Sequence, residues 1–581
     1  MTLSLKRYRN LLVTYFLPQW ALALLLFILL FANIGLSLAN PQILSSFIDG
    51  VSAGEPLQAL LNAALLFLAI ACLAQIFSVI ESYVAENLGQ ITTNKLRADL
   101  TLHCLQLDPA FHTAHTPGEL IERVDGDVAK LGNFFSRFAV AILGNAFLLV
   151  GVLVMLFRID WRVGTVLTFF AIVSLLIISK LRNLATPYWE KERQASAELF
   201  GFLEERLSGT EDIRSSGATT YMIRGLAQHT RAVLHRLITA AQINFATWGS
   251  MTFLFTLGTA IALALGIYLF TTHAITIGVV YLIFSYATLL ARPIQQIVQQ
   301  LRDLQETTGS IVRIFALLDM HSTIQDGIGT PVPAGPLSAE FADVSFSYVD
   351  DLLVLKHIDF SLKPGIVMGL LGRTGSGKST LSKLLVRLYD PQAGAVRLGG
   401  IDLRDMRLED LREHIGMVTQ DVHILHATVR DNLTLFDASI PDERIIQALE
   451  DLGLGEWYLS LPEGLDTRLA PGGSGLSAGE AQLVSFARVF LKDPGLVILD
   501  EASSRLDPAT ERQLEHAIDR LLAGRTGIII AHRLATVLRT DIIMILENGT
   551  CCEYGRREEL ERNPDSRFAH LLRTGLEEAL V

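Results

Sequence analysis

Long runs of apolar residues fill the first half of the chain and become rare after about residue 300. A helix needs roughly 20 apolar residues to cross the hydrocarbon core of a bilayer. Six runs meet or approach this length, at residues 20–38, 60–80, 138–157, 163–178, 248–270 and 275–290. The fourth and sixth runs are short, and we expect them to extend at their ends. None contains an ionised residue, so the pattern predicts six membrane-spanning helices rather than the buried helices of a soluble protein.

The positions of lysine and arginine between these runs predict the orientation, since cytosolic loops are enriched in both. The loops at 49–56 and 271–274 contain neither residue and are expected outside. The stretches after the second and fourth runs are long and basic, which predicts that they are cytosolic: Lys95, Arg97, Arg123, Lys130, Lys180, Arg182, Lys191, Arg193, Arg206 and Arg214. The short loop 158–162 runs against this rule, because it should lie outside but carries two arginines around Asp160. Six spans with both termini in the cytosol fit the pattern best.

Helical periodicity continues beyond the apolar runs. Leu96, Leu100, Cys104 and Leu107 follow the i, i+4, i+8, i+11 spacing of an amphipathic helix, so spans two to five should extend into the cytosol as helical pairs. Pro293 is expected to interrupt or bend a helix that continues through 294–318. A stretch rich in glycine and proline follows, and then strands and helices alternate. The sequence thus predicts a helical transmembrane domain at 1–320, a linker at 321–336 and an α/β nucleotide-binding domain at 337–581.

Composition refines the class of protein. Hydrophobic residues make up 50% of the 581 residues and the mean hydropathy is +0.39, which is too apolar for an ordinary soluble enzyme. The formal net charge of −12 argues against nucleic acid as a partner. The four cysteines fit neither a disulfide framework nor a zinc site. Because the compact chain carries no recognisable targeting extension, we expect it in a plasma membrane, which for a bacterium is the inner membrane.

A glycine-rich loop in the second half carries the strongest chemical signal. Residues 372–379 match G-x-x-x-x-G-K-[ST], between an apolar strand at 366–371 and a helical run at 379–389. In such a loop, backbone N–H groups and the N-terminus of the helix surround phosphate oxygens. Lys378 should reach the β- and γ-phosphates, and the Ser379 hydroxyl should bind Mg²⁺. The predicted phosphate-binding residues are Gly372, Arg373, Thr374, Gly375, Ser376, Gly377, Lys378, Ser379 and Thr380.

A carboxylate pair follows a second apolar strand at 496–499. Asp500, at the end of this strand, fits the acidic residue that helps to hold Mg²⁺ in phosphate-loop NTPases. Glu501 comes next and would be aimed at the attacking water as general base. Together with the glycine-rich loop, the pair predicts nucleotide hydrolysis that is coupled to the membrane domain.

With these motifs after six spans, the chain resembles exporter-type half-transporters of the ATP-binding cassette (ABC) family over essentially its whole length. The resemblance implies that ATP and Mg²⁺ are the cofactors, with Ser379, Gln420 and Asp500 around the metal. It also implies that Tyr348 stacks on adenine and that His532 contacts the γ-phosphate as the switch histidine. Asp507 lies in the segment that resembles the loop after the catalytic glutamate. The place of the family signature is taken by Leu476, Ser477, Ala478, Gly479 and Glu480.

The signature implies a partner, because in this family it faces the γ-phosphate bound to a second cassette. The usual signature is Leu-Ser-Gly-Gly-Gln, and this chain departs from it at Ala478 and Glu480. Ala478 adds a methyl group where backbone approaches phosphate, and Glu480 adds negative charge near an anion. Lys378, Glu501 and His532 are intact. We therefore expect a heterodimer in which the partner supplies the intact signature, with a homodimer as the alternative.

Two further departures accompany the changed signature. Residues 469–473 replace a segment that in the family carries a glutamate contacting the membrane domain, and Arg505 stands where the family has alanine. The resemblance also implies short cytosolic coupling helices near 109–116 and 216–221, which would transmit cassette closure to the spans.

The cargo is specified poorly by the spans, which are rich in aromatic residues and contain few polar ones. The residues that could line a cavity are Phe27, Phe31, Phe147, Phe253, Phe255, Asn33, Gln75, Asn145 and Asn244, with Glu81 as a partner for a cation. This composition favours export of an apolar or amphipathic drug, lipid or peptide. ATP-driven import on the same scaffold and an ATP-gated channel or regulator are the alternatives, although an intact Glu501 argues against a simple gate.

Overall fold

The computed structural model describes residues 12–133, 142–349, 352–470, 476–500, 508–531 and 534–574. The chain forms two compact units, which are described one at a time. The first comprises Met1–Gln106 and His115–His321, and the second comprises Leu107–Ala114 and Ser322–Val581. The boundary before Ser322 falls inside the segment predicted to be a linker. The short segment Leu107–Ala114 belongs by its contacts to the second unit, although it lies within the predicted transmembrane domain.

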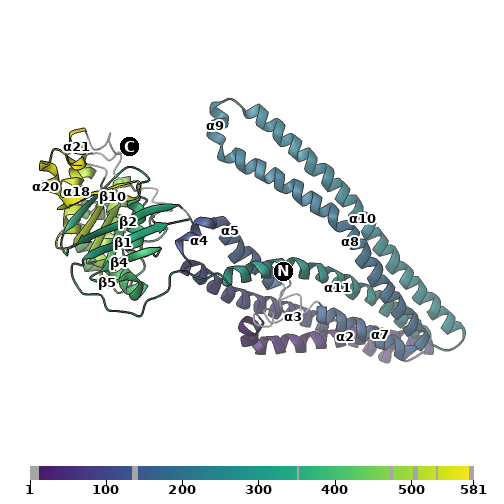
Figure 1. Ribbon diagram of the computed structural model, residues 1–581. Helices are drawn as coiled ribbons and strands as arrows, with labels where there is room; N and C mark the ends of the chain where they lie inside the picture. Colours follow the sequence, from purple (N-terminus) through teal and green to yellow (C-terminus); the bar gives the residue numbers. More distant parts are fainter. Residues whose placement is uncertain are drawn as a thin grey trace. The chain divides into compact units, whose positions relative to one another are not determined.

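Long helices make up the first unit (Figure 1). They are η1 (Leu12–Phe16), η2 (Leu17–Gln19), α2 (Trp20–Ala53), α3 (Leu57–Gln106), α5 (Pro117–Ile121), η3 (Glu122–Asp127), α6 (Val128–Asn133), α7 (Gly144–Ile159), α8 (Trp161–Ser208), α9 (Thr210–Ser215), α10 (Thr219–Thr271) and α11 (Ile277–Leu318). Within the described residues, five helices are long and apolar enough to cross a membrane. The third predicted span corresponds to α7, which is apolar but shorter, and residues 138–141 of that span lie outside the described residues.

Several of these helices are much longer than a bilayer requires, as the periodicity predicted. The longest, α10, contains 53 residues, so it is about 80 Å long at 1.5 Å per residue. It runs beside α8, and the short helix α9 joins the two at one end (Figure 1). α11 includes Pro293 and continues to Leu318, so of the two predicted outcomes, an interruption or a bend, the interruption does not occur.

The short helix nearest to the coupling helix predicted near 216–221 is α9, and it lies earlier in the chain. α9 spans Thr210–Ser215, and Thr219 already begins α10. Gly217 ends α9 with a left-handed φ of 63°, and the N–H of Ala218 donates to the carbonyl of Ile213 at 3.0 Å. A glycine in this conformation is a common stop for a helix, and the predicted bounds missed it.

Polar contacts tie the helices of the first unit together at several points. Tyr286, which is fully buried, donates its hydroxyl to the carbonyl of Leu38 at 2.8 Å and accepts from Gln42 at 2.9 Å. Near the start of α11, Asp49 accepts from the Thr276 hydroxyl at 2.7 Å and from the N–H of Gly278 at 2.8 Å. These contacts join the second half of α2 to the first turns of α11.

Two sheets form the centre of the second unit. The antiparallel sheet has the order β2-β1-β4-β5. Its strands are β1 (Ala339–Ser347), β2 (Leu353–Leu362), β4 (Ala393–Leu398) and β5 (Ile401–Asp402). The larger sheet has the order β10-β9-β3-β8-β7-β6 and is parallel except for β10. Its strands are β3 (Val367–Leu371), β6 (Ile415–Val418), β7 (Leu496–Asp500), β8 (Thr526–Ile530), β9 (Ile542–Glu547) and β10 (Thr550–Arg556).

The second unit also contains helices and turns. They are α4 (Pro109–Ala114), α12 (Lys378–Leu385), η5 (Leu403–Asp405), α13 (Leu408–His414), α14 (Val429–Thr434), α15 (Asp442–Asp451), α16 (Gly455–Ser460), η6 (Gly464–Asp466), α17 (Ala478–Lys492), α18 (Pro508–Leu522), α19 (Leu534–Val537), α20 (Arg557–Arg562) and α21 (Arg567–Thr574). Of these, α12, α13, α17 and α20 contact the strands of the unit. β7 and β8 are buried along almost their whole length, as expected for central parallel strands. The predicted fold class, a helical apolar domain followed by an α/β domain, is confirmed.

Candidate nucleotide site

The carboxyl ends of four neighbouring parallel strands bring the predicted site residues to one edge of the larger sheet. β3, β8, β7 and β6 are adjacent and parallel, so their ends lie side by side. The glycine-rich loop follows β3 directly, Asp500 ends β7, and Gln420 comes two residues after β6. In open α/β sheets, this edge is where ligands bind.

Three glycines give the loop a backbone path that other residues would strain. Gly372, Gly375 and Gly377 have φ values of 150°, 80° and 107°. A Cβ on Gly372 would lie 2.3 Å from the carbonyl oxygen of Leu546, and one on Gly377 would lie 2.6 Å from Leu355 Cδ2. At Gly375 nothing lies within 4 Å, so the middle of the loop faces open space. The glycines both permit the turn and keep that space clear.

Lys378 is the first residue of α12 and is held inside the loop. Its side chain is buried, and Nζ donates to the carbonyls of Gly372 at 2.5 Å and Arg373 at 3.0 Å. Burial lowers the pKa of Lys378, while the negative charge of Asp500 opposes that shift. The hydroxyl of Ser376 is buried and has no hydrogen-bond partner among the described residues. An ammonium, an unsatisfied hydroxyl and the N-terminus of a helix fit a phosphate group well.

Two of the three metal ligands predicted from sequence, Ser379 and Asp500, lie close together at this edge. The Ser379 hydroxyl lies 3.5 Å from Oδ2 of Asp500, and Gln420 is exposed beyond β6. No group of three or more His, Cys, Asp or Glu that could hold a metal occurs in the described part of the chain. One carboxylate, one hydroxyl and one amide fit Mg²⁺ when phosphate oxygens and water supply its remaining ligands.

Tyr348 follows β1 and lies against the start of α12. Its hydroxyl is 3.1 Å from the Thr380 hydroxyl, and its ring packs edge-on against Phe346 and Tyr389. The side chain remains 45% exposed, which leaves ring surface for a stacking partner. The structure thus puts the predicted adenine-stacking residue next to the phosphate-binding helix.

Three predicted residues, Glu501, Asp507 and His532, lie outside the described residues, as does Arg505. The residues before Glu501 and His532, Asp500 and Ala531, are described. Asp500 pairs with Ile530 across β7 and β8. In sequence, Glu501 is the next residue after β7, and His532 comes two residues after β8. Their assignment continues to rest on the sequence motifs.

The signature residues form the beginning of α17, and this is where the structure adds most to the sequence. Ser477 is the N-cap of α17, and its hydroxyl accepts from the N–H of Glu480 at 3.2 Å. Glu480 reaches back and accepts from the N–H of Ser477 at 2.7 Å. This reciprocal pair is a capping box, which the spacing S-x-x-E could have predicted. The Glu480 carboxylate therefore lies at the N-terminus of the helix, where an anion would bind.

Comparison with known proteins gives matches over both units. Residues 23–294 match the family described as "ABC transporter transmembrane region", and residues 355–504 match the family described as "ABC transporter". An uncharacterized ABC transporter ATP-binding protein of Bacillus subtilis is 31% identical over 487 residues, covering 81% of this chain and 78% of the relative. A probable multidrug resistance ABC transporter of the same bacterium is 31% identical over 502 residues, covering 84% and 73%.

A more distant relative and a solved structure extend this similarity. An ATP-dependent lipid A-core flippase of Syntrophus aciditrophicus is 28% identical over 484 residues, covering 83% of this chain and 80% of the relative. The structure of a bacterial Atm1-family ABC exporter with ATP bound superposes with a TM-score of 0.80 at 24% identity. The match covers 95% of this chain and 98% of that one, so the two share a fold over nearly their entire lengths.

Proposed function

The chain belongs to the ABC transporter family, and from that premise we propose that it exports an apolar or amphipathic molecule across the plasma membrane as one half of a heterodimeric pump. The observation that carries the proposal is the fusion, in one chain, of a transmembrane region with a cassette in which Lys378, Ser379 and Asp500 meet. Relatives named for multidrug resistance and for lipid A-core flipping support a cargo that partitions into lipid. The aromatic spans are consistent with such a cargo.

Each residue of the nucleotide site has a role in the proposed reaction. Lys378 and the loop N–H groups hold the phosphates of ATP, and Tyr348 stacks on its adenine. Ser379, Asp500 and Gln420 would hold Mg²⁺, which neutralises charge on the phosphates. Glu501 takes a proton from the attacking water, and His532 holds the γ-phosphate through the reaction. Both of these residues are intact in this chain.

The proposed partner follows from Glu480. In the family, the N-terminus of the signature helix contacts the γ-phosphate of the other cassette, and here a carboxylate of the same chain occupies that position. Because two anions at one helix N-terminus repel each other, this signature should hold the partner's ATP weakly. We therefore propose that the partner carries the intact signature and completes the site of Lys378 and Glu501. Both termini and both cassettes lie in the cytosol in this arrangement.

The export step is tested with membrane vesicles from cells that express the chain together with its partner. A fluorescent amphipathic amine should accumulate in everted vesicles on addition of ATP, and Lys378→Ala should abolish the accumulation. Uptake into right-side-out vesicles instead would indicate import. An ion current that needs ATP binding but not hydrolysis would indicate a channel, and either result would overturn the proposal.

A further inference from the structure

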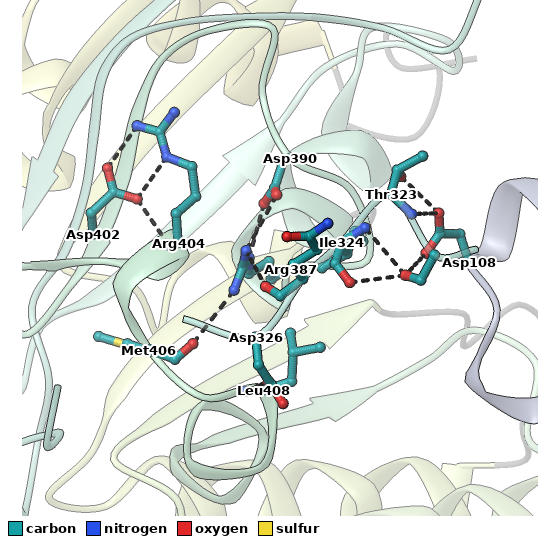
Figure 2. Close-up of polar contacts among 12 residues, drawn as sticks. Asp108, Thr323, Ile324, Asp326, Arg387, Asp390, Asp402, Arg404, Met406 and Leu408 are labelled. Atoms are coloured by element: carbon teal, nitrogen blue, oxygen red, sulfur yellow. Dashed lines mark hydrogen bonds and ion pairs between the residues drawn. The ribbon is translucent and has the colours of Figure 1, made fainter. Parts of the chain in front are cut away.

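The residue before α4 is hydrogen-bonded to the segment that was predicted to be a linker. Asp108 directly precedes α4, and its carboxylate accepts hydrogen bonds from Ser322 and Thr323 (Figure 2). The Thr323 N–H and hydroxyl both donate to Oδ2 at 2.7 Å. Burial raises the pKa of Asp108, but these hydrogen bonds have the larger, opposite effect. The net pKa lies below the usual value, so the group is held as a carboxylate. Three donors on one carboxylate make a strong polar contact.

The Asp108 contact lies close to the points where the chain passes from one compact unit to the other. The chain passes between the two compact units three times, after Gln106, after Ala114 and after His321. Asp108 lies two residues beyond the end of α3, and Ser322 lies four residues beyond the end of α11. The Asp108 contact therefore joins two of these three crossings, immediately after the long helices that lead into them.

The same linker is fastened to the cassette a few residues later. Arg387 is 3% exposed, and its guanidinium donates to the carbonyl of Gln325 at 2.9 Å while it pairs with Asp390 (Figure 2). Asp326 accepts from the N–H of Leu408 at 2.8 Å, at the start of α13. A Cβ on Gly327 would lie 2.4–2.6 Å from backbone atoms of residues 404–406, so the linker lies flat against the cassette there.

Arg387 also connects this attachment to the nucleotide site. It follows α12, the helix that begins with Lys378 and Ser379 in the phosphate-binding loop. α12 has eight residues, so it spans only about 12 Å. The cassette makes a second contact with α4, because the side chains of Tyr389 and Thr113 share a hydrogen bond.

We propose that residues 322–327 form a coupling bridge, in which Asp108 and Arg387 are positioning residues that transmit nucleotide binding from α12 to α4. The inference rests on the proposed ATP-driven function, because it assigns the path by which the nucleotide site acts on the helix next to α3. A linker that only joined two domains would not need a buried arginine at one end and a carboxylate with three donors at the other.

Hydrogen–deuterium exchange of the full chain tests the bridge, and because all its contacts lie in one chain, no partner is needed. In a Glu501→Gln background that retains ATP, Mg·ATP should protect the peptide 372–385 and change exchange in 107–116. Asp108→Ala should keep the first effect and lose the second. The control Glu409→Ala alters an exposed acid near the linker and should keep both effects.

Two additional variants separate the bridge from simple loss of folding. Gly327→Ala lifts the linker at its other end and should also lose the response in 107–116. Gly201→Ala, a helical glycine with nothing within 4 Å, should not. If the response in 107–116 persists in Asp108→Ala and Gly327→Ala, the bridge is refuted while nucleotide binding stands. If the parent shows no protection of 372–385, the nucleotide function fails and the inference fails with it.

Discussion

At the scale of single residues, the site depends on atoms that only particular side chains can supply. The sequence motif predicted the phosphate loop, and the structure gives the reasons in the positive φ angles and close contacts of its glycines. The position of the Glu480 side chain could not be predicted from a motif in the same way. Its departure from the family signature was visible in the sequence, but the position of its carboxylate depends on the capping geometry at Ser477.

Replacing Glu480 with glutamine should strengthen the signature. Glutamine can keep the capping box, while the negative charge at the helix N-terminus is removed. Interactions of this kind are worth ~0.3–1 kcal/mol, so ATP-driven association with the partner cassette should tighten by about two- to fivefold. The measurement is an ATP titration of association in the Glu501→Gln background.

The matched variant Glu480→Ala removes both the charge and the carboxylate's part of the capping box. Because the Ser477 hydroxyl still caps the helix, only the hydrogen bond from the Ser477 N–H is lost, which should lower the thermal stability of the cassette by ~0.5–1.5 kcal/mol. If Glu480→Gln leaves association unchanged or weakens it, the carboxylate is not a competitor for the phosphate.

Gly372 provides a second prediction at this scale. An added methyl group would meet the carbonyl of Leu546 at 2.3 Å, in a backbone conformation that is already unfavourable. Since such strain costs ~1–3 kcal/mol before any clash, Gly372→Ala should weaken ATP binding by about tenfold or more. Binding of a fluorescent ATP analogue measures this, with Gly201→Ala as control. Unchanged binding would show that the loop adopts another path.

At the scale of elements, hydrophobic periodicity predicted most of the fold because each long helix keeps one pattern for many turns. Apolar runs predicted α2, α3, α8, α10 and α11, and the strands around the nucleotide site followed from apolar stretches next to known motifs. The short elements were harder. α9 ends just before Gly217, whose left-handed backbone stops the helix. The sequence alone does not distinguish this glycine from the other glycines of the chain. Contacts such as Asp108 with Thr323 join residues distant in sequence, and no local pattern encodes them.

An ion pair between the buried carboxylate of Asp127 and the half-exposed side chain of Arg313 joins η3 to α11 and makes the stability of the first unit depend on pH. Asp127 is 1% exposed and accepts from Arg313 Nε at 2.7 Å, with Lys130 at 3.6 Å. Burial raises the pKa of Asp127, but the hydrogen bonds and charge of Arg313 have a larger effect in the opposite direction. The net pKa therefore lies below its usual value. A carboxylate of this kind stabilises the fold above its unfolded pKa of about 3.9, and the effect is lost as pH falls through the folded pKa.

Thermal melting between pH 7 and pH 3 should reveal this contribution. We expect Arg313→Ala to cost about 1–3 kcal/mol at neutral pH, because it removes the main hydrogen-bond donor of a buried carboxylate. Lys130→Ala, at a half-exposed lysine, should cost less than about 1 kcal/mol. In Asp127→Asn, the loss of stability at low pH should be smaller than in the parent. Equal effects of Arg313→Ala and Lys130→Ala would contradict this assignment.

At the scale of the whole molecule, the proposed function requires a pair of cassettes, because one stretch of this chain, residues 355–504, matches the cassette family. In this proposal, Lys378 and Asp500 belong to a site that binds ATP, whereas Glu480 belongs to a signature that serves a partner poorly. In a homodimer, both sites would be closed by this weak signature. In a heterodimer, one site would be closed by an intact signature from the partner, and that site would drive transport.

The ATPase rate of this chain purified alone in lipid, compared with Glu501→Gln, tests this account most directly. The sample must be shown to bind ATP, through a rise in melting temperature that Lys378→Ala removes. The account predicts a chain that binds ATP but hydrolyses it negligibly until its partner is added. Robust hydrolysis by the chain alone, abolished by Glu501→Gln, would show that a homodimer is sufficient and would contradict the proposed heterodimer.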